Sequence, residues 1–483
     1  MARAEGANGA PRRLRGLAAA LALAGCATTI DNRPQNLPIT PAFVEQAQRE
    51  RGIVGSNVVA LSLSGGGLRA AAFGFGVIQA LARSGPAGDD LFGDLTFISS
   101  VSGGSLTAAY VGLHGRAALG RFEREVLVRD YERELRTSLW SPANLLRLVA
   151  GGLNDRNHLA ATLDADVFRG ATFADLYRAN KPDVWINATD LFNRTPFPFT
   201  PPVFMGLCSD LAQLRVSEAV AASMAVPLVF APVVLKTWPE HCLSEPPRWV
   251  ARALEPGDAT ASVVGATARA VLRYRNPERM RYVKLADGGL TDNQGLASIL
   301  MARAVSETPH GPFTETDAVR IRRMLFLIVD AGRPPSGDWA LRPDGPSGVE
   351  VGVAAADAAV DSATRLSAAA FRTMAEDWRR AIVDFRCALP PERARALLPP
   401  GSEWRCDDVR FYIGVVGFES LAPARAERLR TMPTRLALSA ADIEAAVGAG
   451  RDAALDHPVL RRYLSERIGP VGPAVSAASA PAR

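Results

Sequence analysis

Apolar runs that end in small residues mark the first part of the chain. Positions 57–63 are apolar or small without alternation, a pattern typical of a strand buried on both faces. A glycine loop over 64–67 follows, and an apolar, helix-like run then extends to about Leu81. A second unalternated run over 95–101 ends at the small residues 102–105. The pattern predicts strand, glycine loop, helix, strand, sharp turn and helix, in that order.

The same kind of pattern continues toward the C-terminus. Largely apolar runs predict strands over 184–190, 282–287, 323–330 and 409–416. Apolar spacing of 3.6 residues predicts a long helix over 348–383, and we also expect helices over 121–148, 440–451 and 458–467. Strands that alternate with helices predict an α/β fold with a mostly parallel central sheet. In such sheets, ligands and chemistry gather at the carboxyl ends of the strands, where both early runs stop.

Ser102 is the candidate nucleophile. A nucleophile elbow, G-x-S-x-G, needs small residues two before and two after the serine because its turn is tight. Gly104 meets the later requirement, whereas Ser100 stands in place of the earlier glycine. Of the neighbouring serines, only Ser102 has small residues on both sides at these offsets. The motif alone fits equally a serine that caps a helix N-terminus.

The glycine loop allows three interpretations. Gly65-x-Gly67-x-x-Ala70 fits a loose dinucleotide fingerprint, but Asp89 and Asp90 fall in a Gly/Pro-rich loop and do not close a strand. A P-loop would need a Gly-Lys-Ser/Thr sequence that does not follow. The third interpretation is an oxyanion hole. N–H groups at a helix N-terminus favour negative charge, and glycine lets a substrate oxygen approach them.

Asp287 ends the predicted strand over 282–287 and is followed by two glycines. It would share a sheet edge with Ser102 if the strands are parallel. The bland alternative is a turn aspartate before glycine, and Asp292 is interpreted as the N-cap of the next helix. A serine nucleophile needs a base, and none of the five histidines sits at a clear strand end. A carboxylate base needs a partly desolvated site, because its ordinary pKa is near 4.

Four motifs in this order resemble the patatin-like phospholipase family. They are Ser64-Gly-Gly-Gly-Leu-Arg-Ala70, Ser100-Val-Ser-Gly-Gly104, Ala219-x-x-Ala222-Ser223-x-Ala225-x-Pro227 and Asp287-Gly-Gly289, and Asn187-Ala-Thr-Asp190 followed by Pro196-Phe-x-Phe-Thr200 also looks like the bacterial members. The resemblance covers roughly residues 55–335. No single motif is specific, but the four in order are.

The resemblance implies a three-layer α/β/α sandwich and a Ser–Asp dyad in place of a Ser–His–Asp triad. Ser102 would be the nucleophile and Asp287 the base, and the implied reaction is hydrolysis of phospholipid or related acyl esters through an acyl-enzyme. No cofactor is expected. The oxyanion donors would be Gly65, Gly66 and Gly67, with Arg69, Gly104, Gly288 and Gly289 in support. Arg69 would steady the loop or meet a substrate phosphate, and its bland alternative is a solvated or ion-paired surface residue.

The N-terminus is typical of an exported lipoprotein. Arginines at 12, 13 and 15 precede an apolar run over 17–25 that is too short to span a bilayer but suits a signal peptide. The run stops at Leu23-Ala-Gly-Cys26, which resembles a bacterial lipobox with Cys26 as the lipidated residue. An ordinary signal peptide with a chance cysteine is the alternative. Because Ala27 follows, we expect a cell-envelope protein anchored by lipid in the outer membrane.

The charge and composition of the chain argue against a nucleic-acid-binding protein and for a globular one. Residues 1–25 hold four Arg and one Glu, so they carry +3 of the formal net charge of +5 and leave +2 for the remainder. The basic balance therefore does not indicate a nucleic-acid partner. With 48% hydrophobic and 22% charged residues over 483 positions, the composition is that of a globular protein.

Four more cysteines fall into two sequence-local pairs. In an oxidising compartment we favour the disulfides Cys208–Cys242 and Cys387–Cys406, with four buried thiols as the alternative. There is no CxxC motif and the chain has only five His, so no metal site is expected.

The sequence divides into five parts. We predict a signal peptide over 1–25, a lipidated tether over 26–54, a catalytic domain over 55–335, a helical region with a late strand packed on it over 336–468, and a disordered tail over 469–483. Residues 121–148 and 200–280 are hypothesised to shape a lid and an acyl pocket. The predicted function is a serine acyl hydrolase. The rivals are a catalytically silent envelope lipoprotein, which binds lipid or acts as a scaffold, and a nucleotide-binding enzyme.

Overall fold

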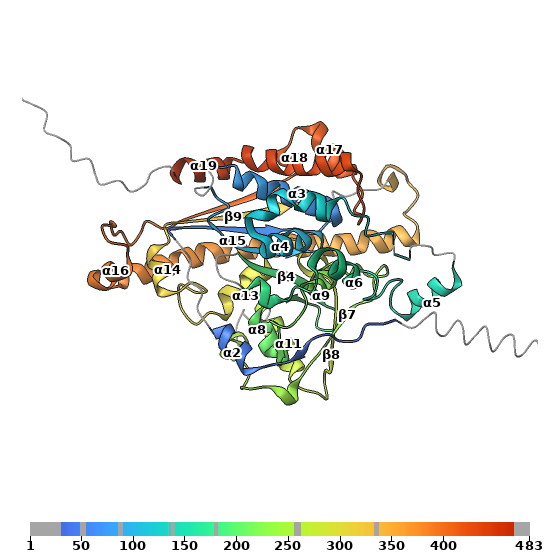
Figure 1. Ribbon diagram of the computed structural model, residues 1–483, viewed down its shortest axis with the longest axis horizontal. Coiled ribbons are helices and arrows are strands. Elements are labelled where there is room, and N and C mark those ends of the chain that lie inside the picture. Colours follow the sequence, from blue (N-terminus) through green and yellow to red (C-terminus); the bar gives the residue numbers. More distant parts are fainter. Residues whose placement is uncertain are drawn as a thin grey trace, which may run out of the picture.

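A mixed sheet of eight strands forms the centre of the part of the chain that the structure describes (Figure 1). The computed structural model describes residues 30–48, 55–85, 90–133, 135–136, 141–177, 182–255, 262–332 and 338–467. The strands follow the order β10-β9-β2-β3-β4-β8-β7, and β5 pairs with β4 off this path, while β1 and β6 form a separate two-stranded sheet. Their bounds are β1 Leu37–Pro38, β2 Asn57–Leu63, β3 Leu95–Val101, β4 Asp183–Asp190, β5 Thr195–Pro198, β6 Ser209–Asp210, β7 Val233–Lys236, β8 Tyr282–Asp287, β9 Arg323–Asp330 and β10 Arg410–Gly417.

Helices cover both faces of this sheet. Their bounds are α2 Pro41–Gln48, α3 Gly67–Ala82, α4 Gly103–His114, α5 Pro142–Ala150, α6 Ala160–Leu163, α7 Phe173–Leu176, α8 Pro201–Leu207, α9 Val216–Ser223, α10 Arg248–Ala253, α11 Val263–Tyr274, α12 Gly289–Asp292, α13 Ala297–Val305, α14 Glu315–Arg320, α15 Gly348–Ala388, α16 Pro391–Leu397, α17 Pro423–Thr431, α18 Ala440–Asp456 and α19 Pro458–Arg467. The α/β fold that the sequence predicts is confirmed.

Strand β2 shows why the apolar pattern lacks alternation. Val59, Leu61 and Leu63 join the larger hydrophobic core, which includes side chains of α3, α4 and α18. Val58 and Ala60 point to the opposite face and join a second core with side chains of α13 and α15. A strand that packs on both faces needs apolar residues at every position.

The central sheet is mostly parallel, as predicted. β10, β9, β2, β3 and β4 pair in parallel, whereas β5 and β8 run antiparallel to β4, and β7 runs antiparallel to β8. The reversal at β8 matters for the candidate site, because that strand ends in Asp287.

The C-terminal region completes the same layers. Its strand β10 extends the central sheet beside β9, and α18 lies along α3 in Figure 1. The two helices approach so closely that glycine is needed at Gly76 and at Gly450. A Cβ at the first position would overlap the Val447 carbonyl, and one at the second would overlap the Phe73 carbonyl. The long helix predicted over 348–383 is α15, which extends to Ala388.

One predicted helix is wrong, and several predictions lie outside the described residues. The stretch 121–148 is not one helix, since it holds a single π-helical turn, Glu123–Leu127, and most of α5. Residues 1–29, with the predicted signal peptide and Cys26, and the predicted tail over 469–483 lie outside the described residues. Within the described ranges, no helix has the length and apolar composition needed to cross a bilayer.

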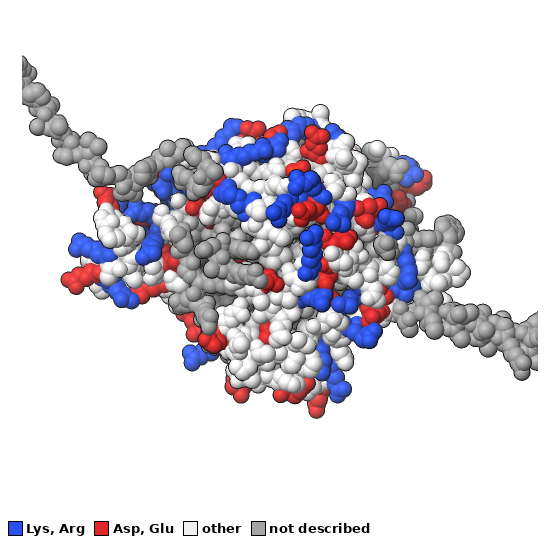
Figure 2. All heavy atoms as spheres, viewed as in Figure 1, with Lys and Arg blue, Asp and Glu red and all other residues white. Residues whose placement is uncertain are grey.

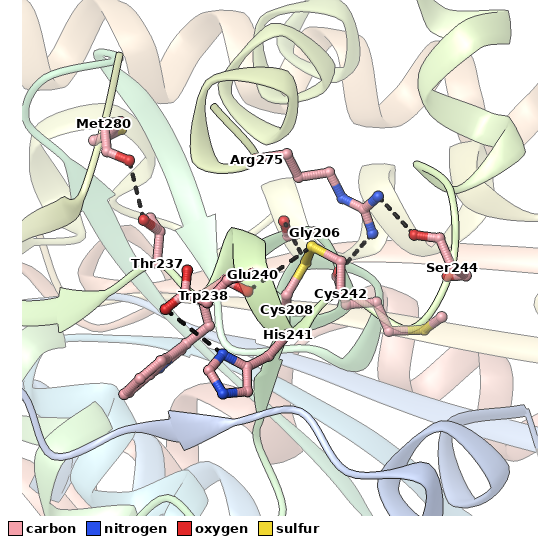
Figure 3. Close-up of a disulfide and its surroundings, with 11 residues drawn as sticks. Gly206, Cys208, Thr237, Trp238, Glu240, His241, Cys242, Ser244, Arg275 and Met280 are labelled. Carbon is pink, nitrogen blue, oxygen red and sulfur yellow. Dashed lines mark hydrogen bonds and ion pairs between the residues drawn. A yellow bond between two sulfur atoms is a disulfide. The ribbon is translucent and has the colours of Figure 1, made fainter. Parts of the chain in front are cut away.

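Two disulfides join the cysteine pairs favoured from the sequence. Cys208, at the end of α8, bonds to Cys242, which follows β7, with their Cα atoms 4.8 Å apart (Figure 3). Cys387, in the last turn of α15, bonds to Cys406, with a Cα separation of 4.9 Å. Beside the second bond, the buried Arg386 donates to Asp408 at 2.6 Å. Each disulfide therefore fastens the end of a helix to a later part of the chain.

Both disulfides should stabilise the fold by restricting the unfolded chain. They close loops with sequence separations of 34 and 19. Replacing Cys387 and Cys406 together by Ala should lower the free energy of unfolding by about 3 kcal/mol, and replacing Cys208 and Cys242 by about 4 kcal/mol. Urea unfolding under oxidising conditions measures both values. A titration of free thiols in the denatured Cys26→Ser chain should find none, and titratable thiols would contradict the pairing.

Candidate active site

Ser102 sits in a strained turn between a strand and a helix. β3 ends at Val101 and α4 begins at Gly103, so Ser102 alone makes the turn, with φ 51° and ψ −123°. A positive φ is rare for a residue with a side chain and persists only where the surroundings enforce it. The Ser102 N–H donates to Ser223 Oγ at 2.8 Å. This backbone geometry is that of a nucleophile elbow.

Small residues let the glycine loop pack directly on this elbow. A Cβ at Gly104 would lie 2.6 Å from the Leu63 carbonyl oxygen, and one at Gly103 would overlap the Gly67 carbonyl. Ser100, the departure from the elbow motif, is fully buried, and its Oγ donates to the Trp185 carbonyl at 3.2 Å. A serine therefore fits at this position without disturbing the turn.

Asp287 lies within hydrogen-bond reach of Ser102. Ser102 Oγ donates to Asp287 Oδ2 at 2.8 Å, and Asp287 Oδ1 accepts the Gly289 N–H at 2.8 Å. The backbone of Asp287 is held from two sides. Its N–H donates to the Ala225 carbonyl at 2.9 Å, and its carbonyl accepts from Thr189 Oγ1 at 2.9 Å. The carboxylate is thus fixed in position before any substrate binds.

The route by which Asp287 reaches Ser102 corrects the assumption of parallel strands. β8 runs antiparallel to β4, so its carboxyl end points toward the amino end of that neighbour. The two strands overlap by only three residue pairs, in which Asp287 faces Ala188. β3 ends at Val101, which pairs with Asn187 of β4, and Asn187 directly precedes Ala188. The carboxyl end of β8 therefore meets the carboxyl end of β3 from the opposite direction.

Burial raises the pKa of the Asp287 carboxyl. The residue is 9% exposed and Ser102 is 7% exposed. Loss of solvent raises the pKa of Asp287 to about 6, although its hydrogen bonds with Gly289 and Ser102 pull the pKa down. Burial also raises the pKa of Asp292 to about 6. Asp292 is the last residue of α12, so its assignment as an N-cap is wrong, because Leu296 is the N-cap of α13. Asp292 Oδ2 nevertheless accepts the Ala297 N–H at 2.5 Å at the start of α13.

Two buried side chains that the sequence analysis left without a role support the elbow. Ser223 Oγ accepts the Ser102 N–H, donates to the Asn187 carbonyl at 2.6 Å, and lies 3.0 Å from Ser105 Oγ. The Asn187 amide donates to Ser99 Oγ at 3.0 Å. Both residues stand in motifs that carry the family resemblance, which was the only signal for them in the sequence.

The glycine loop offers fewer oxyanion donors than the sequence implied. The Gly65 N–H donates to the Asn293 carbonyl at 3.1 Å and is not free for substrate, which corrects its assignment. Gly65 instead allows close approach, since a Cβ there would lie 3.2 Å from Ser102 Cβ. Gly66 has φ 137° and Gly67 has φ 61°, and the described part of the chain supplies no acceptor for either N–H. The Gly103 N–H, next to Ser102, likewise finds none among the described residues.

Arg69 is a buried clamp on the glycine loop. Its side chain is fully buried and donates to three backbone carbonyls, those of Ala331 at 2.9 Å, Met432 at 2.8 Å and Leu429 at 3.3 Å. The bland alternative of a solvated or ion-paired surface residue is wrong, and the geometry favours the loop-steadying role over contact with a phosphate. The Leu68 N–H also donates to the Arg435 carbonyl at 2.9 Å. The segment after α17 therefore supports the loop from outside.

The glycines after Asp287 are required by contact. A Cβ at Gly288 would overlap the Asn187 carbonyl and lie 3.0 Å from Val101 Cγ1. A Cβ at Gly289 would lie 3.1 Å from Asp287 Oδ1. These two positions let the aspartate segment close against the ends of β3 and β4.

The histidines, possible metal ligands and one cavity take no part in the Ser102–Asp287 pair. None of the five histidines forms a hydrogen bond with Ser102 or Asp287. In the ranges that the structure describes, no three His, Cys, Asp or Glu side chains converge as metal ligands. A cavity of about 360 Å³, lined by Phe97, Trp185 and Met301 among others, does not include the serine or the aspartate.

One of the comparisons with known proteins, the family model, agrees with the motifs. The family model described as patatin-like phospholipase matches residues 61–299. A human group IVD cytosolic phospholipase A2 structure aligns with 15% identity and a TM-score of 0.40, covering 89% of this chain and 66% of that one. VipD from Legionella pneumophila aligns with 13% identity and a TM-score of 0.31, covering 91% and 73%. The chain thus spans slightly less than two thirds of the human enzyme. No curated protein matches the sequence.

The clamp interpretation of Arg69 predicts a defect in stability. Arg69→Met leaves three buried carbonyls without their donor, so the free energy of unfolding should fall by about 3–5 kcal/mol. Urea unfolding measures the change. The control is Arg393→Met, which removes an exposed arginine paired with Glu315 at 2.7 Å and should change stability by less than about 0.5 kcal/mol. A stable Arg69→Met protein with a raised KM for phospholipid alone would instead indicate phosphate binding.

Proposed function

Because residues 61–299 form a domain of the patatin-like phospholipase family, we propose that the chain is a lipid acyl-ester hydrolase with Ser102 as nucleophile and Asp287 as base. The observation that carries the proposal is the 2.8 Å hydrogen bond from Ser102 Oγ to Asp287 Oδ2, made at a strained elbow. The pair needs no third residue to orient the base, since the Gly289 N–H and the backbone contacts of Asp287 already hold the carboxylate.

The first half of the reaction forms an acyl-enzyme. Ser102 Oγ attacks the ester carbonyl while its proton passes to Asp287 Oδ2. Negative charge then develops on the former carbonyl oxygen. The N–H groups of Gly66, Gly67 and Gly103 are the candidates to bind it, each typically contributing about 3–4 kcal/mol to the transition state. When the tetrahedral intermediate collapses, the leaving alcohol takes the proton from Asp287.

The second half repeats these steps with water. Asp287 removes a proton from a water molecule that attacks the acyl carbonyl, and Ser102 Oγ leaves with that proton as the fatty acid is released. A pKa of about 6 suits this role. An aspartate at its ordinary pKa near 4 would bind a proton about 100-fold more weakly.

The substrate class follows from the family, and the anchor follows from the sequence. A phospholipid or related acyl ester is the proposed substrate. The proposed location is the outer membrane, with a lipid chain on Cys26, supported by the Leu-Ala-Gly-Cys sequence that ends the leader. A catalytically silent lipid-binding lipoprotein is the rival. The intact Ser102–Asp287 pair favours the enzyme.

Removal of either member of the pair should abolish turnover. Ser102→Ala and Asp287→Asn should each lower kcat/KM for p-nitrophenyl butyrate by at least about 1,000-fold, because the nucleophile and its base act as a unit. Circular dichroism should remain that of the parent. Ser100→Ala is the matched control, since it removes a neighbouring buried hydroxyl and should keep most of the activity.

A fluorophosphonate probe separates the enzyme from its silent rival. It should label the parent and Ser100→Ala but not Ser102→Ala. A folded parent that resists the probe and hydrolyses no ester would favour the silent lipoprotein.

The buried base predicts an acid limit to activity. Below its pKa of about 6, Asp287 is protonated and cannot accept the serine proton, so kcat/KM should fall tenfold per pH unit under pH 6 and level off above it. The profile is measured with p-nitrophenyl butyrate between pH 4.5 and 8.

A second buried carboxyl needs a control in that experiment. Asp292 has a similar pKa but accepts only backbone N–H groups. Asp292→Asn should therefore keep the limit near pH 6. A limit near pH 4, or its loss in Asp292→Asn, would contradict Asp287 as the titrating base.

A further inference from the structure

Helix α5 presents its apolar side chains outward. Leu145 and Leu146 are half exposed and Val149 is 88% exposed. The one charged residue of the helix, Arg147, is buried and pairs with Asp155 at 2.9 Å. A helix that faces water normally shows the reverse arrangement. An outward apolar face without acidic residues is typical of a helix that lies in a membrane interface.

The loop after α9 extends this apolar face. Leu228 is 67% exposed, and Val226 and Val229 are also exposed. The segment that follows α5 is hydrogen-bonded to the loop. The Leu153 N–H donates to the Leu228 carbonyl at 3.1 Å, and the Asn154 N–H donates to the Val229 carbonyl at 3.0 Å. We call this surface the apolar platform, and it consists of Leu145, Leu146, Val149, Val226, Leu228 and Val229.

The platform carries no acidic side chain and adjoins the candidate site. Positions 219–235 contain no charged residue, and Arg147 is the only one over 141–154. Figure 1 shows α5 as a projection, and the described atoms at the tip of this projection are white in Figure 2. The loop begins one residue after Ala225, whose carbonyl accepts the Asp287 N–H. A surface that covers the platform would therefore lie close to the Ser102–Asp287 pair.

The N-terminal end of the described chain lies against the same helix. Ile30, the first described residue, reaches within 3.8 Å of the Cβ position at Gly151, directly after α5. The Asp31 N–H donates to Asp155 at 3.2 Å, and Asn32 donates to the Pro232 carbonyl at 2.7 Å. Cys26 is four residues earlier in the sequence, and four residues span at most about 14 Å. A lipid chain on Cys26 would hold α5 beside the bilayer.

We propose that the apolar platform is a membrane-docking surface that inserts into the interface of a lipid bilayer and sets the Ser102–Asp287 pair against it. The choice of a bilayer as occupant rests on two observations together, the outward apolar face and the position of the N-terminal end of the described chain beside it. The inference rests on the proposed function for the lipid anchor on Cys26 and for its consequence, which is faster attack on lipids in a membrane. The docking itself is a property of the surface.

The first test separates docking from chemistry. The triple variant Leu145→Ser/Leu146→Ser/Val149→Ser, in the full chain, should hydrolyse vesicles of phosphatidylethanolamine and phosphatidylglycerol (3:1) at least about 10-fold more slowly than the parent. Its turnover of soluble p-nitrophenyl butyrate should stay within twofold, because none of the three residues contacts the pair. The matched control is Leu243→Ser/Leu272→Ser, which alters exposed leucines away from α5 and should leave both rates within twofold. Equal loss of both rates, or no loss with vesicles, would overturn the docking surface.

The second test reads docking without any reaction. A fluorophore is attached at Val149→Cys or at Leu272→Cys in the full chain reconstituted into the same vesicles, with the unsubstituted chain labelled as a blank. Brominated lipids should quench the probe at 149 and leave the probe at 272 unchanged. Equal quenching at both positions would overturn the proposal. So would concentration-dependent burial of the probe at 149 without vesicles, which would assign the platform to a second copy of the chain. Quenching at 149 in a protein that hydrolyses no ester would keep the docking surface and overturn the proposed activity.

Discussion

Two backbone turns that meet with no side chain between them form the basis of this site. The end of β2 and the start of α4 touch where Gly104 lies against the Leu63 carbonyl and Gly103 against the Gly67 carbonyl. A methyl group at either glycine would push the turns apart and remove the glycine loop from Ser102. The unusual backbone angles of Ser102 follow from the same contact, because a relaxed turn would not bring α4 under the loop. Ser223, through its bond to the Ser102 N–H, holds the strained residue in place.

Support for this contact comes from remote parts of the chain. Arg69 extends from the first turn of α3 to carbonyls at positions 331, 429 and 432, so the loop depends on the C-terminal region. α18 in turn lies on α3 through the close contacts at Gly76 and Gly450, and β10 extends the central sheet. The region after 335 therefore contributes to the structure of the loop. The sequence analysis described this region only as packed on the catalytic domain, and that description is incomplete.

The sequence predicted what local pattern and spacing encode. The unalternated runs located β2, β3 and β9, and the small residues after them located both turns of the site. The sequence pattern could not predict the direction of strand pairing, because β8 has the same apolar pattern whether it runs parallel or antiparallel to β4. Loop-steadying by Arg69 was one of the roles expected from the sequence, but its three acceptors were not predictable, since they are backbone carbonyls that any sequence supplies. The assignment of Gly65 failed for a similar reason, because the acceptor of its N–H is the carbonyl of Asn293, more than 200 residues away.

The burial of Asp287 links the pKa of its carboxyl to the way in which a substrate would reach Ser102. The pKa of Asp287 is raised to about 6 because solvent is excluded around it, and water entering the site would move that pKa back toward its ordinary value near 4. A lipid substrate has to reach a serine that is only 7% exposed, so any opening that admits the ester also threatens to hydrate the carboxyl. Covering that opening with a bilayer, as the apolar platform would do, lets the acyl chain enter from a medium as dry as the site. Docking would then preserve the proton affinity that the proposed deacylation needs, while the water for that step would enter after the alcohol has left.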